Sequence, residues 1–273
     1  MSRTPVALTI AGSDSGGGAG IQADLKAFAT RGVHGTSAIT AITAQNTLGV
    51  SAIHPVPAEI VIAQVRAVAE DIGVDVVKIG MLGDRATIAA VAEALGKLPP
   101  ETPVVVDPVM VAESGARLLR EDAREALIAE ILPRATVLTP NVPEARALLG
   151  LEPRSGASAE EAAELARALL GLGPAAVVLT GGHRDEAIDL LLTGAAWAPV
   201  EIAGPRHPDG AAHGSGCTHA AALAAGLALG EDLERAARAA RELAGEAVRR
   251  GLRELGGGPG PVDAIGLAER RRG

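Results

Sequence analysis

Short apolar runs rich in β-branched residues alternate with longer amphipathic segments along most of this chain. Continuously apolar runs of this length are typical of strands that are buried on both faces. Their alternation with helical segments predicts a mostly parallel sheet covered by helices on both sides. The predicted strands are Val6–Ala11, Thr36–Thr43, Val76–Ile79, Val104–Asp107, Val137–Thr139 and Ala176–Thr180.

The segments between these strands have apolar residues at helical spacing and carry polar faces. The predicted helices are Ile21–Arg31, Ala58–Glu70, Arg85–Leu98, Arg120–Leu132 and Ala159–Leu170. In the last third, short antiparallel edge strands are expected at Ile188–Leu192 and Val200–Ile202, and helices at Ser215–Leu229 and Leu233–Arg250. We find no domain boundary and expect one domain spanning residues 1–273.

Composition excludes several classes of protein. The 273 residues carry a formal net charge of -8, which disfavours a general nucleic-acid or anionic-membrane binder. One cysteine excludes a disulfide framework and a multi-cysteine zinc site. One Trp, one Phe and no Tyr nearly exclude aromatic platforms for bases. Because neither a signal peptide nor an apolar run long enough to span a bilayer is present, we expect a soluble, cytoplasmic protein.

Polar residues and glycines follow nearly every predicted parallel strand. In open α/β sheets, ligands bind at the carboxyl ends of the strands. The residues that fall there are Gly12–Gly18, Gln45–Asn46, Gly80–Met81, Asp107, Asn141 and Gly181–Gly182. This coincidence favours an enzyme over a scaffold protein.

A glycine-rich loop over residues 11–20 follows the first strand. Glycines let the backbone approach a ligand closely, although for a generic glycine run a flexible strand-to-helix turn is the favoured interpretation. The loop lacks the Gly-Lys-Ser/Thr ending of a Walker A motif and the acidic partner of a dinucleotide fingerprint. Asp24 lies one turn into the next helix, where the simplest interpretation is an exposed carboxylate near the helix dipole.

A second glycine loop, His213–Thr218, leads into an Ala/Leu-rich helix. Free N–H groups and the positive dipole end make a helix N-terminus of this kind an anion site. Cys217 lies in the first turn, where the pKa of a thiol is typically lowered from about 8.5. The alternative is a small buried cysteine at a tight helix start, but the flanking glycines favour a functional role.

Two carboxylates follow buried strands. Asp107 ends a Val-Val-Val run, where a charge is costly unless it is solvated or paired. Glu144 lies one turn into a helix after Asn141, and it is interpreted either as a cap partner or as a carboxylate that holds Mg²⁺ near a phosphate. The histidines are not spaced as a metal cluster, and no Gly-x-Ser-x-Gly elbow is present.

Taken in order, these motifs resemble the hydroxymethylpyrimidine/phosphomethylpyrimidine kinases of thiamine biosynthesis, within the ribokinase-like superfamily. The segments that carry the resemblance are Ala7–Asp14, Gly17–Lys26, Thr43–Thr47, Lys78–Leu82, Asp107–Met110, Thr139–Ala145, Gly181–His183, His213–Thr218 and Gly260–Val262. The resemblance implies a three-layer αβα sandwich with a mostly parallel central sheet, and a homodimer. It also implies two steps that depend on ATP and Mg²⁺: phosphorylation of 4-amino-5-hydroxymethyl-2-methylpyrimidine, then of its monophosphate to the diphosphate.

The resemblance also implies roles for individual residues. The backbone amides of Gly214, Ser215, Gly216 and Cys217 would form the anion hole for the transferring phosphoryl group. Cys217 occupies the position where most ribokinase-like enzymes carry an Asp base, but a thiol is a poor partner for an alcohol proton. We therefore expect the anion hole to contribute more to the rate than proton abstraction does.

The remaining site residues are also expectations from the resemblance. Asp107 and Glu144 would organise Mg²⁺ and water. The nucleotide is expected at Asn141, Thr180, Gly182 and His213. Gln45 would read the pyrimidine edge, because an amide both donates and accepts hydrogen bonds. Gly12, Asp24, Met81 and Val109 match other substrate-contacting positions.

Three departures from the family pattern stand out. Thr180 stands where family members often carry Lys, Ser215 replaces a usual Thr, and Gly256–Gly258 replaces a Gly-His-Gly. A pyridoxal kinase of the same fold is the nearest rival, although Gln45 and Met81 favour the pyrimidine. A non-catalytic nucleotide sensor is disfavoured by the two carboxylates and the second glycine loop. A Rossmann dehydrogenase is disfavoured because its acidic ribose-binding residue has no good candidate.

Overall fold

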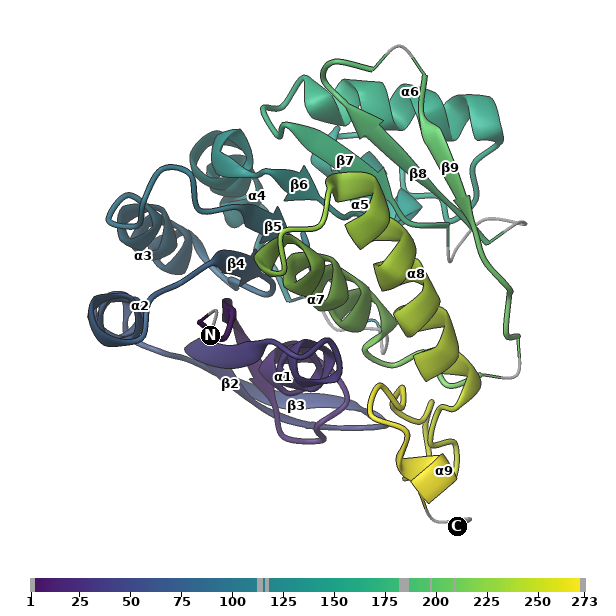
Figure 1. Ribbon diagram of the computed structural model, residues 1–273, viewed down its shortest axis with the longest axis horizontal. Helices are drawn as coiled ribbons and strands as arrows, with labels where there is room; N and C mark the ends of the chain where they lie inside the picture. The colour runs from purple at the N-terminus through teal and green to yellow at the C-terminus, as the bar shows by residue number, and fades with distance from the viewer. Residues whose placement is uncertain are drawn as a thin grey trace.

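A single sheet runs through the molecule. The computed structural model describes residues 3–111, 115, 118–181, 187–196, 198–208 and 210–270 (Figure 1). Within these residues, nine strands form one sheet in the order β3-β2-β1-β4-β5-β6-β7-β8-β9. The strands are β1 (Val6–Asp14), β2 (His34–Asn46), β3 (Gly49–Pro55), β4 (Val76–Ile79), β5 (Val104–Val106), β6 (Val137–Leu138), β7 (Ala176–Leu179), β8 (Ile188–Thr193) and β9 (Val200–Ala203).

Neighbouring strands from β2 to β7 are parallel, whereas β3, β8 and β9 pair antiparallel at the two edges. This arrangement confirms the predicted parallel core and the two predicted antiparallel strands near the end of the sheet. The hairpin of β2 and β3 differs from the expectation, because β2 continues to Asn46 and β3 follows at once. Most side chains of β3 are exposed, so the strand has no buried face that a pattern could reveal.

Helices cover both faces of the sheet (Figure 1). They are α1 (Gly20–Thr30), α2 (Ala58–Asp71), α3 (Arg85–Leu95), α4 (Arg124–Ala126), α5 (Val142–Leu148), α6 (Ala159–Leu170), α7 (Ser215–Ala228), α8 (Leu233–Arg249) and α9 (Leu267–Arg270). The helix predicted over Arg120–Leu132 is instead a series of short α, 3-10 and π turns over residues 121–134. None of the helices in the described ranges is long and apolar enough to cross a membrane.

Two apolar clusters separate the layers. On one face, alternate strand residues such as Leu8 and Val77 pack with α2, α3, α5 and α6. On the other face, Ala7 and Val76 pack with α1, α7 and α8. This sorting follows from the two-residue period of a strand, which sends successive side chains to opposite faces. It produces the three-layer αβα sandwich that was expected.

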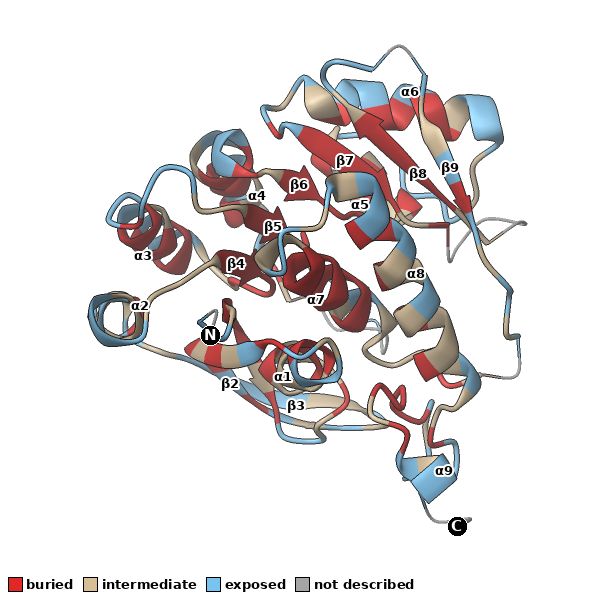
Figure 2. Cartoon of the chain, viewed as in Figure 1, coloured by how far each residue is buried: buried red, intermediate tan, exposed pale blue. Residues whose placement is uncertain are grey.

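Helix α7 packs on β1, β4 and β5, with α1 and α8 beside it in the same layer, and it is buried on nearly every side (Figure 2). A helix that is apolar all round is one that belongs in a core. Its alanines let the neighbouring helices approach closely, which suits a core without aromatic bulk. Its N-terminus is thereby fixed above the carboxyl ends of the central strands.

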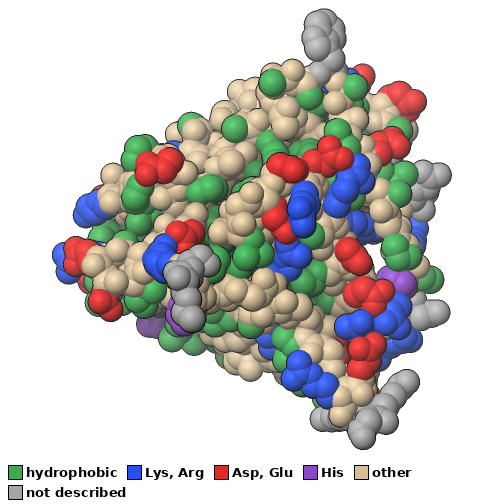
Figure 3. All heavy atoms as spheres, viewed as in Figure 1, with side chains coloured by type: hydrophobic (Ala, Val, Ile, Leu, Met, Phe, Trp, Pro, Cys, Tyr) green, Lys and Arg blue, Asp and Glu red, His purple; other side chains and the backbone are tan. Residues whose placement is uncertain are grey.

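The outer face of α8 carries charges of both signs (Figure 3). Arg238 pairs with Glu234 at 2.7 Å, and Arg249 pairs with Glu246 at 2.8 Å. Exposed pairs of this kind stabilise a helix by only a few tenths of a kcal/mol each, about 0.3–0.5. Because the two signs alternate along this helix, its outer face offers no basic stripe to a nucleic acid.

Candidate active site

A cleft of about 1300 Å³ opens at the carboxyl ends of the central strands. Of the residues expected at the site, those that line it are Gly12, Gln45, Met81, Asp107, Val109, Asn141, Glu144, Thr180, His213, Gly214, Ser215, Gly216 and Cys217. Gly182 lies outside the described residues. Asp24 does not line the cleft, and its side chain is 0% exposed. One cavity therefore collects groups from β1, β2, β4, the ends of β5 to β7, and the start of α7.

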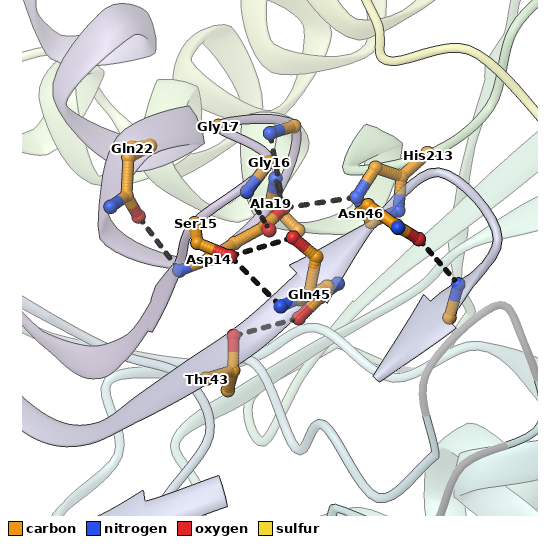
Figure 4. Close-up of polar contacts among 12 residues, drawn as sticks. Asp14, Ser15, Gly16, Gly17, Ala19, Gln22, Thr43, Gln45, Asn46 and His213 are labelled. Atoms are coloured by element: carbon orange, nitrogen blue, oxygen red, sulfur yellow. Dashed lines mark hydrogen bonds and ion pairs between the residues drawn. The ribbon is translucent and has the colours of Figure 1, made fainter. Parts of the chain in front are cut away.

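Asp14 organises the first glycine loop, a role that was not predicted from the sequence. Its carboxylate accepts backbone N–H bonds from Gly16 (2.7 Å), Gly18 (3.0 Å) and Ala19 (2.8 Å). The ring of His213 lies 3.0 Å from the same carboxylate (Figure 4). Burial alone would raise the pKa of Asp14, but the hydrogen bonds from His213 and these amides outweigh it and lower that pKa. An aspartate just before a glycine run is the available sequence signal for such a turn.

The two glycine loops interlock at the floor of the cleft. Gly214 has a φ of +86°, which favours glycine. A Cβ at this position would overlap the backbone oxygen of Gly18. The bond between His213 and Asp14 ties the same two loops together. The N-terminus of α7 is therefore fixed against the first loop by close backbone contact, and His213 acts in the described structure as part of that joint.

The first turn of α7 offers free amides to the cleft. The amide of Ser215 donates to the backbone oxygen of Ala212 at 2.9 Å. The amides of Gly216 and Cys217 have no acceptor in the part of the chain that the structure describes. Such free N–H groups at the positive end of a helix form an anion-binding site. The anion hole therefore has fewer free amides than predicted, because the amide of Ser215 already donates to Ala212.

The thiol of Cys217 does not have the lowered pKa that its position suggested. Burial raises the pKa of Cys217 to about 12; Lys78 opposes the rise, and Asp107 and Asp24 add to it. The expectation was wrong because the effect of a helix terminus is outweighed where the thiol is desolvated beside carboxylates. At neutral pH the side chain is therefore a thiol and not a thiolate.

A buried ion-pair network lies in the wall of the cleft. The ammonium of Lys78 on β4 lies 3.0 Å from Asp24 and 3.5 Å from Asp107. Thr9 donates to Asp24 at 2.6 Å. Burial by itself lowers the pKa of Lys78, but the charge of Asp24 and its neighbours raises it above the ordinary value, so the ammonium stays charged. Asp24 is thus neither exposed nor at the substrate surface, contrary to both interpretations of the sequence.

Glu144 is a cap partner, which is one of the two interpretations that the sequence left open. Its carboxylate accepts from the amide of Asn141 at 2.9 Å, and its own amide donates to the Asn141 side chain at 2.8 Å. This capping box starts α5. Burial, followed by the nearby charge of Asp107, raises the pKa of Glu144 to about 8. Two carboxylates that repel one another this strongly form a place where a cation is favourable.

The donor set fits Mg²⁺. Asp107 lines the cleft, where its Oδ2 atom lies 3.5 Å from Lys78 but accepts no hydrogen bond, and Glu144 lies close enough to feel its charge. Groups of three or more metal-ligating side chains are absent from the described ranges. Mg²⁺ is commonly held by one or two carboxylates together with water and substrate phosphates, so Asp107 and Glu144 suffice for such a site.

The opposite end of the cleft is suited to a small flat ring. Gln45 lies on β2, where its backbone is held by Ser15 through bonds of 2.8 Å and 2.6 Å. Thr43 donates to the Gln45 side-chain oxygen at 3.2 Å (Figure 4). Met81 packs against Gly12, where a Cβ would lie 3.1 Å from its sulfur. The lining of the cleft therefore includes both a polar amide and an apolar thioether, and we call this part of the cleft the slot at Gln45.

A second polar cluster at the cleft was not expected from the sequence. Asp189 on β8 accepts from the Gly181 amide at 2.7 Å and lies 3.2 Å from His219. Burial would raise the pKa of Asp189, but His219 and then Arg241 lower it. The cluster fixes the turn that follows Thr180. A lone aspartate inside an otherwise apolar strand was the signal that could have revealed it.

The glycine run at Gly256–Gly258 explains one departure from the family pattern. Gly256 has a φ of +78°, and a Cβ on Gly258 would overlap the backbone of Thr47. A Cβ on Gly257 would meet only Leu48, at 3.5 Å. Gly256 and Gly258 therefore require glycine, because they pack against Thr47 in the β2–β3 hairpin. The middle position, Gly257, tolerates a side chain.

Comparison with known proteins identifies the family. The phosphomethylpyrimidine kinase family matches residues 14–263. A relative from Rhizobium meliloti, named hydroxymethylpyrimidine/phosphomethylpyrimidine kinase, is 51% identical over 95% of this chain and 96% of its own. A crystal structure of phosphomethylpyrimidine kinase from Clostridium difficile is 40% identical over 90% of this chain and 100% of its own, with a TM-score of 0.77. The pyridoxal kinase from Staphylococcus aureus in complex with AMP-PCP and pyridoxal is 33% identical, with a TM-score of 0.84, and covers 98% of this chain and 96% of its own.

Proposed function

Because the chain belongs to the phosphomethylpyrimidine kinase family, we propose that it phosphorylates 4-amino-5-hydroxymethyl-2-methylpyrimidine with ATP and then phosphorylates the monophosphate to the diphosphate. These are steps of thiamine biosynthesis. The observation that supports this proposal best is the single cleft that joins the slot at Gln45 to the free amides at the start of α7. Phosphoryl transfer needs such alignment and charge stabilisation more than covalent chemistry.

The chain's own residues divide the work between three parts of the cleft. Gln45 would hydrogen-bond the pyrimidine edge, while Gly12, Met81 and Val109 would pack against its ring. The nucleotide would lie toward Asn141, Thr180 and Gly182, with His213 at the joint of the two loops. Thr180 would contact phosphate through its hydroxyl, without the charge that a lysine supplies. The amides of Gly214, Gly216 and Cys217 would receive the transferring phosphoryl group, because they are already oriented toward developing negative charge.

Asp107 and Glu144 would hold Mg²⁺ in this proposal. The ion, when bound, supplies charge neutralisation to the phosphates. Glu144 must release a proton when it becomes a metal ligand near neutral pH, because its pKa is raised to about 8. Asn141 fixes one oxygen edge of that carboxylate through the capping box and thereby orients it.

Neither step requires the Cys217 thiolate. Phosphoryl transfer passes through a loose transition state in most analyses, so the acceptor hydroxyl need not lose its proton early. In the second step the acceptor is a phosphate monoester, whose second pKa is about 6, so its oxygen is already ionised at neutral pH. A site without a strong base therefore suits both acceptors.

The proposed enzyme acts in the cytoplasm as a homodimer. Support for a second copy comes from apolar side chains on the β2–β3 hairpin that remain exposed, namely Ile42 at 53%, Leu48 at 69% and Ile53 at 40%. Sedimentation equilibrium of the purified chain tests this part of the proposal. A monomer at all concentrations up to those used for catalysis would contradict it.

ADP release with Mg-ATP tests the activity directly. The acceptors are the hydroxymethylpyrimidine, its monophosphate and pyridoxal, and NAD(P)H oxidation serves as the control for a dehydrogenase. We expect ADP release with both pyrimidines, with the monophosphate and diphosphate identified by mass spectrometry. Release with pyridoxal alone would assign the chain to the rival kinase, and no release with any acceptor would remove the kinase assignment.

A further inference from the structure

Lys78 is a buried cation in the cleft wall that the proposed mechanism leaves unused. It neighbours Thr9 across the paired strands β1 and β4, and its side chain is 0% exposed. Space for the ammonium exists because residue 80 is glycine: a Cβ at Gly80 would lie 2.9 Å from the Lys78 nitrogen. A lysine held in this way needs partners, because an unpaired buried charge is strongly unfavourable.

The ammonium of Lys78 lies between two carboxylates, one that is buried in the core and one that lines the cleft. Asp24, on α1, lies 3.0 Å away and is itself fixed by the hydroxyl of Thr9. Asp107, at the end of β5, lies 3.5 Å away and lines the cleft. Asp24 does not line the cleft, so it contacts Lys78 from behind. The four side chains thus form one chain of contacts from the core to the site.

Asp107 depends on this chain for its orientation. Its buried Oδ2 atom has no hydrogen-bond donor among the residues that the structure describes. Lys78 is the charged group that the structure places beside that oxygen. An anchored ammonium fixes the direction of a carboxylate, and a displacement of about 1 Å in a reacting site can lower the rate about a hundredfold.

We propose that Lys78 is a positioning residue for the phosphoryl transfer: anchored by Asp24, it holds the Asp107 carboxylate in place at the cleft. Asp24 then acts through Lys78 and not by contact with the pyrimidine. This inference rests on the proposed function. The competing explanation is that Lys78 only neutralises Asp24, as a structural pair within the core.

A double variant separates the two explanations. Lys78→Met combined with Asp24→Asn removes both charges with little change in shape, so neither Lys78 nor Asp24 is left unpaired in the core, and Asp107 alone loses its charged partner. We expect a folded protein whose kcat is lowered about a hundredfold. A kcat equal to that of the unchanged chain would overturn the proposal, because it would show that the pair only balances itself.

Binding of the pyrimidine gives a readout that does not depend on turnover. In calorimetry without Mg-ATP, we expect the double variant to bind the hydroxymethylpyrimidine with a Kd within about twofold of the unchanged chain. A Kd raised about tenfold or more would overturn the assignment, because it would place Asp24 in direct contact with the ring. Arg31→Met with Glu231→Gln is the matched control: it removes an ion pair (2.7 Å) just after α1, and neither of its residues lines the cleft.

Thr9 provides a gentler test at the far end of the chain of contacts. Thr9→Val removes the hydroxyl that fixes Asp24, and we expect kcat to fall about tenfold with the pyrimidine Kd unchanged. Thr9→Ser keeps the hydroxyl and should restore the rate. Equal loss in both variants would indicate a packing defect and count against the proposal. Absence of ADP release by the unchanged chain would instead remove the proposed function itself.

Discussion

Cys217→Ala separates the thiol from the backbone amide at the start of α7. The substitution keeps the N–H group and the helix, and removes only the sulfur. The pKa of the thiol is raised to about 12 by burial, despite the charge of Lys78. The thiolate would therefore have to form against its environment before it could accept a proton from the acceptor hydroxyl.

The magnitudes decide against a base. At pH 7.5, a pKa of about 12 makes the thiolate less stable than the thiol by about 6 kcal/mol. General base catalysis contributes about 10²–10⁴ in rate, or about 3–5 kcal/mol. The free energy needed to form the thiolate is therefore larger than the lowering of the activation free energy that a general base provides. We expect Cys217→Ala to keep kcat within about tenfold of the unchanged chain.

The matched variant is Cys217→Pro, which removes the amide instead. Proline is tolerated best at the first position of a helix, and Cys217 is the third residue of α7, so circular dichroism checks that this variant keeps its fold. Loss of one donor from an anion hole typically lowers kcat about 10²–10³-fold. Steady-state ADP release from pH 6 to 9, with pyrimidine Kd values from calorimetry, measures both variants. The reasoning is refuted if Cys217→Ala loses about 10³-fold in kcat while the Kd is unchanged, or if Cys217→Pro retains full activity.

Three further outcomes are expected. Gly214→Ala should lower kcat about a hundredfold or more, because its Cβ would displace the anion-binding turn; ADP release that equals that of the unchanged chain would contradict the interlocked loops. Glu144 has its pKa raised from 4.5 to about 8, so its contribution to stability is fully present below pH 4.5 and is lost as the pH rises through about 8. The Tm of the unchanged chain should therefore fall more steeply from pH 5 to 8.5 than that of Glu144→Gln, and parallel curves would argue against the shift. Gly258→Ala should lower the free energy of unfolding by about 1–3 kcal/mol, whereas Gly257→Ala should change it by less than about 0.5 kcal/mol; urea denaturation measures both, and equal effects would contradict the hairpin contact.

The parallel core could be predicted because burial on both faces leaves a direct trace in the sequence. Runs such as Val104–Val106 are apolar without interruption, and the strand pairing follows the expected order. The strand β3 left no such trace, because most of its side chains face solvent. The segment over residues 121–134 has helical periodicity but folds as short turns of different pitch, which periodicity alone does not distinguish.

The lining of the cleft was accessible from the sequence, but its internal partners were not. The rule that ligands gather at strand ends found Asp107 and Asn141, and the resemblance to a family supplied their roles. The pairing of Lys78 with Asp24 joins residues 54 positions apart, which no local pattern encodes. The prediction of a lowered pKa for Cys217 was wrong for a related reason. That pKa is set by burial and by carboxylates from other elements.

The contact between Asp14 and His213 joins residues that are 199 positions apart. Closure of a loop of that length costs about 5 kcal/mol in chain entropy, whereas one hydrogen bond to a charged group returns about 1.5–3 kcal/mol. The bond therefore cannot close the loop by itself, and it forms only once α7 has docked against α1 and the sheet. We therefore expect the floor of the cleft to form late in folding, together with the docking of α7. A partly folded chain in which α7 has loosened would keep its parallel strands and lose its anion-binding amides first.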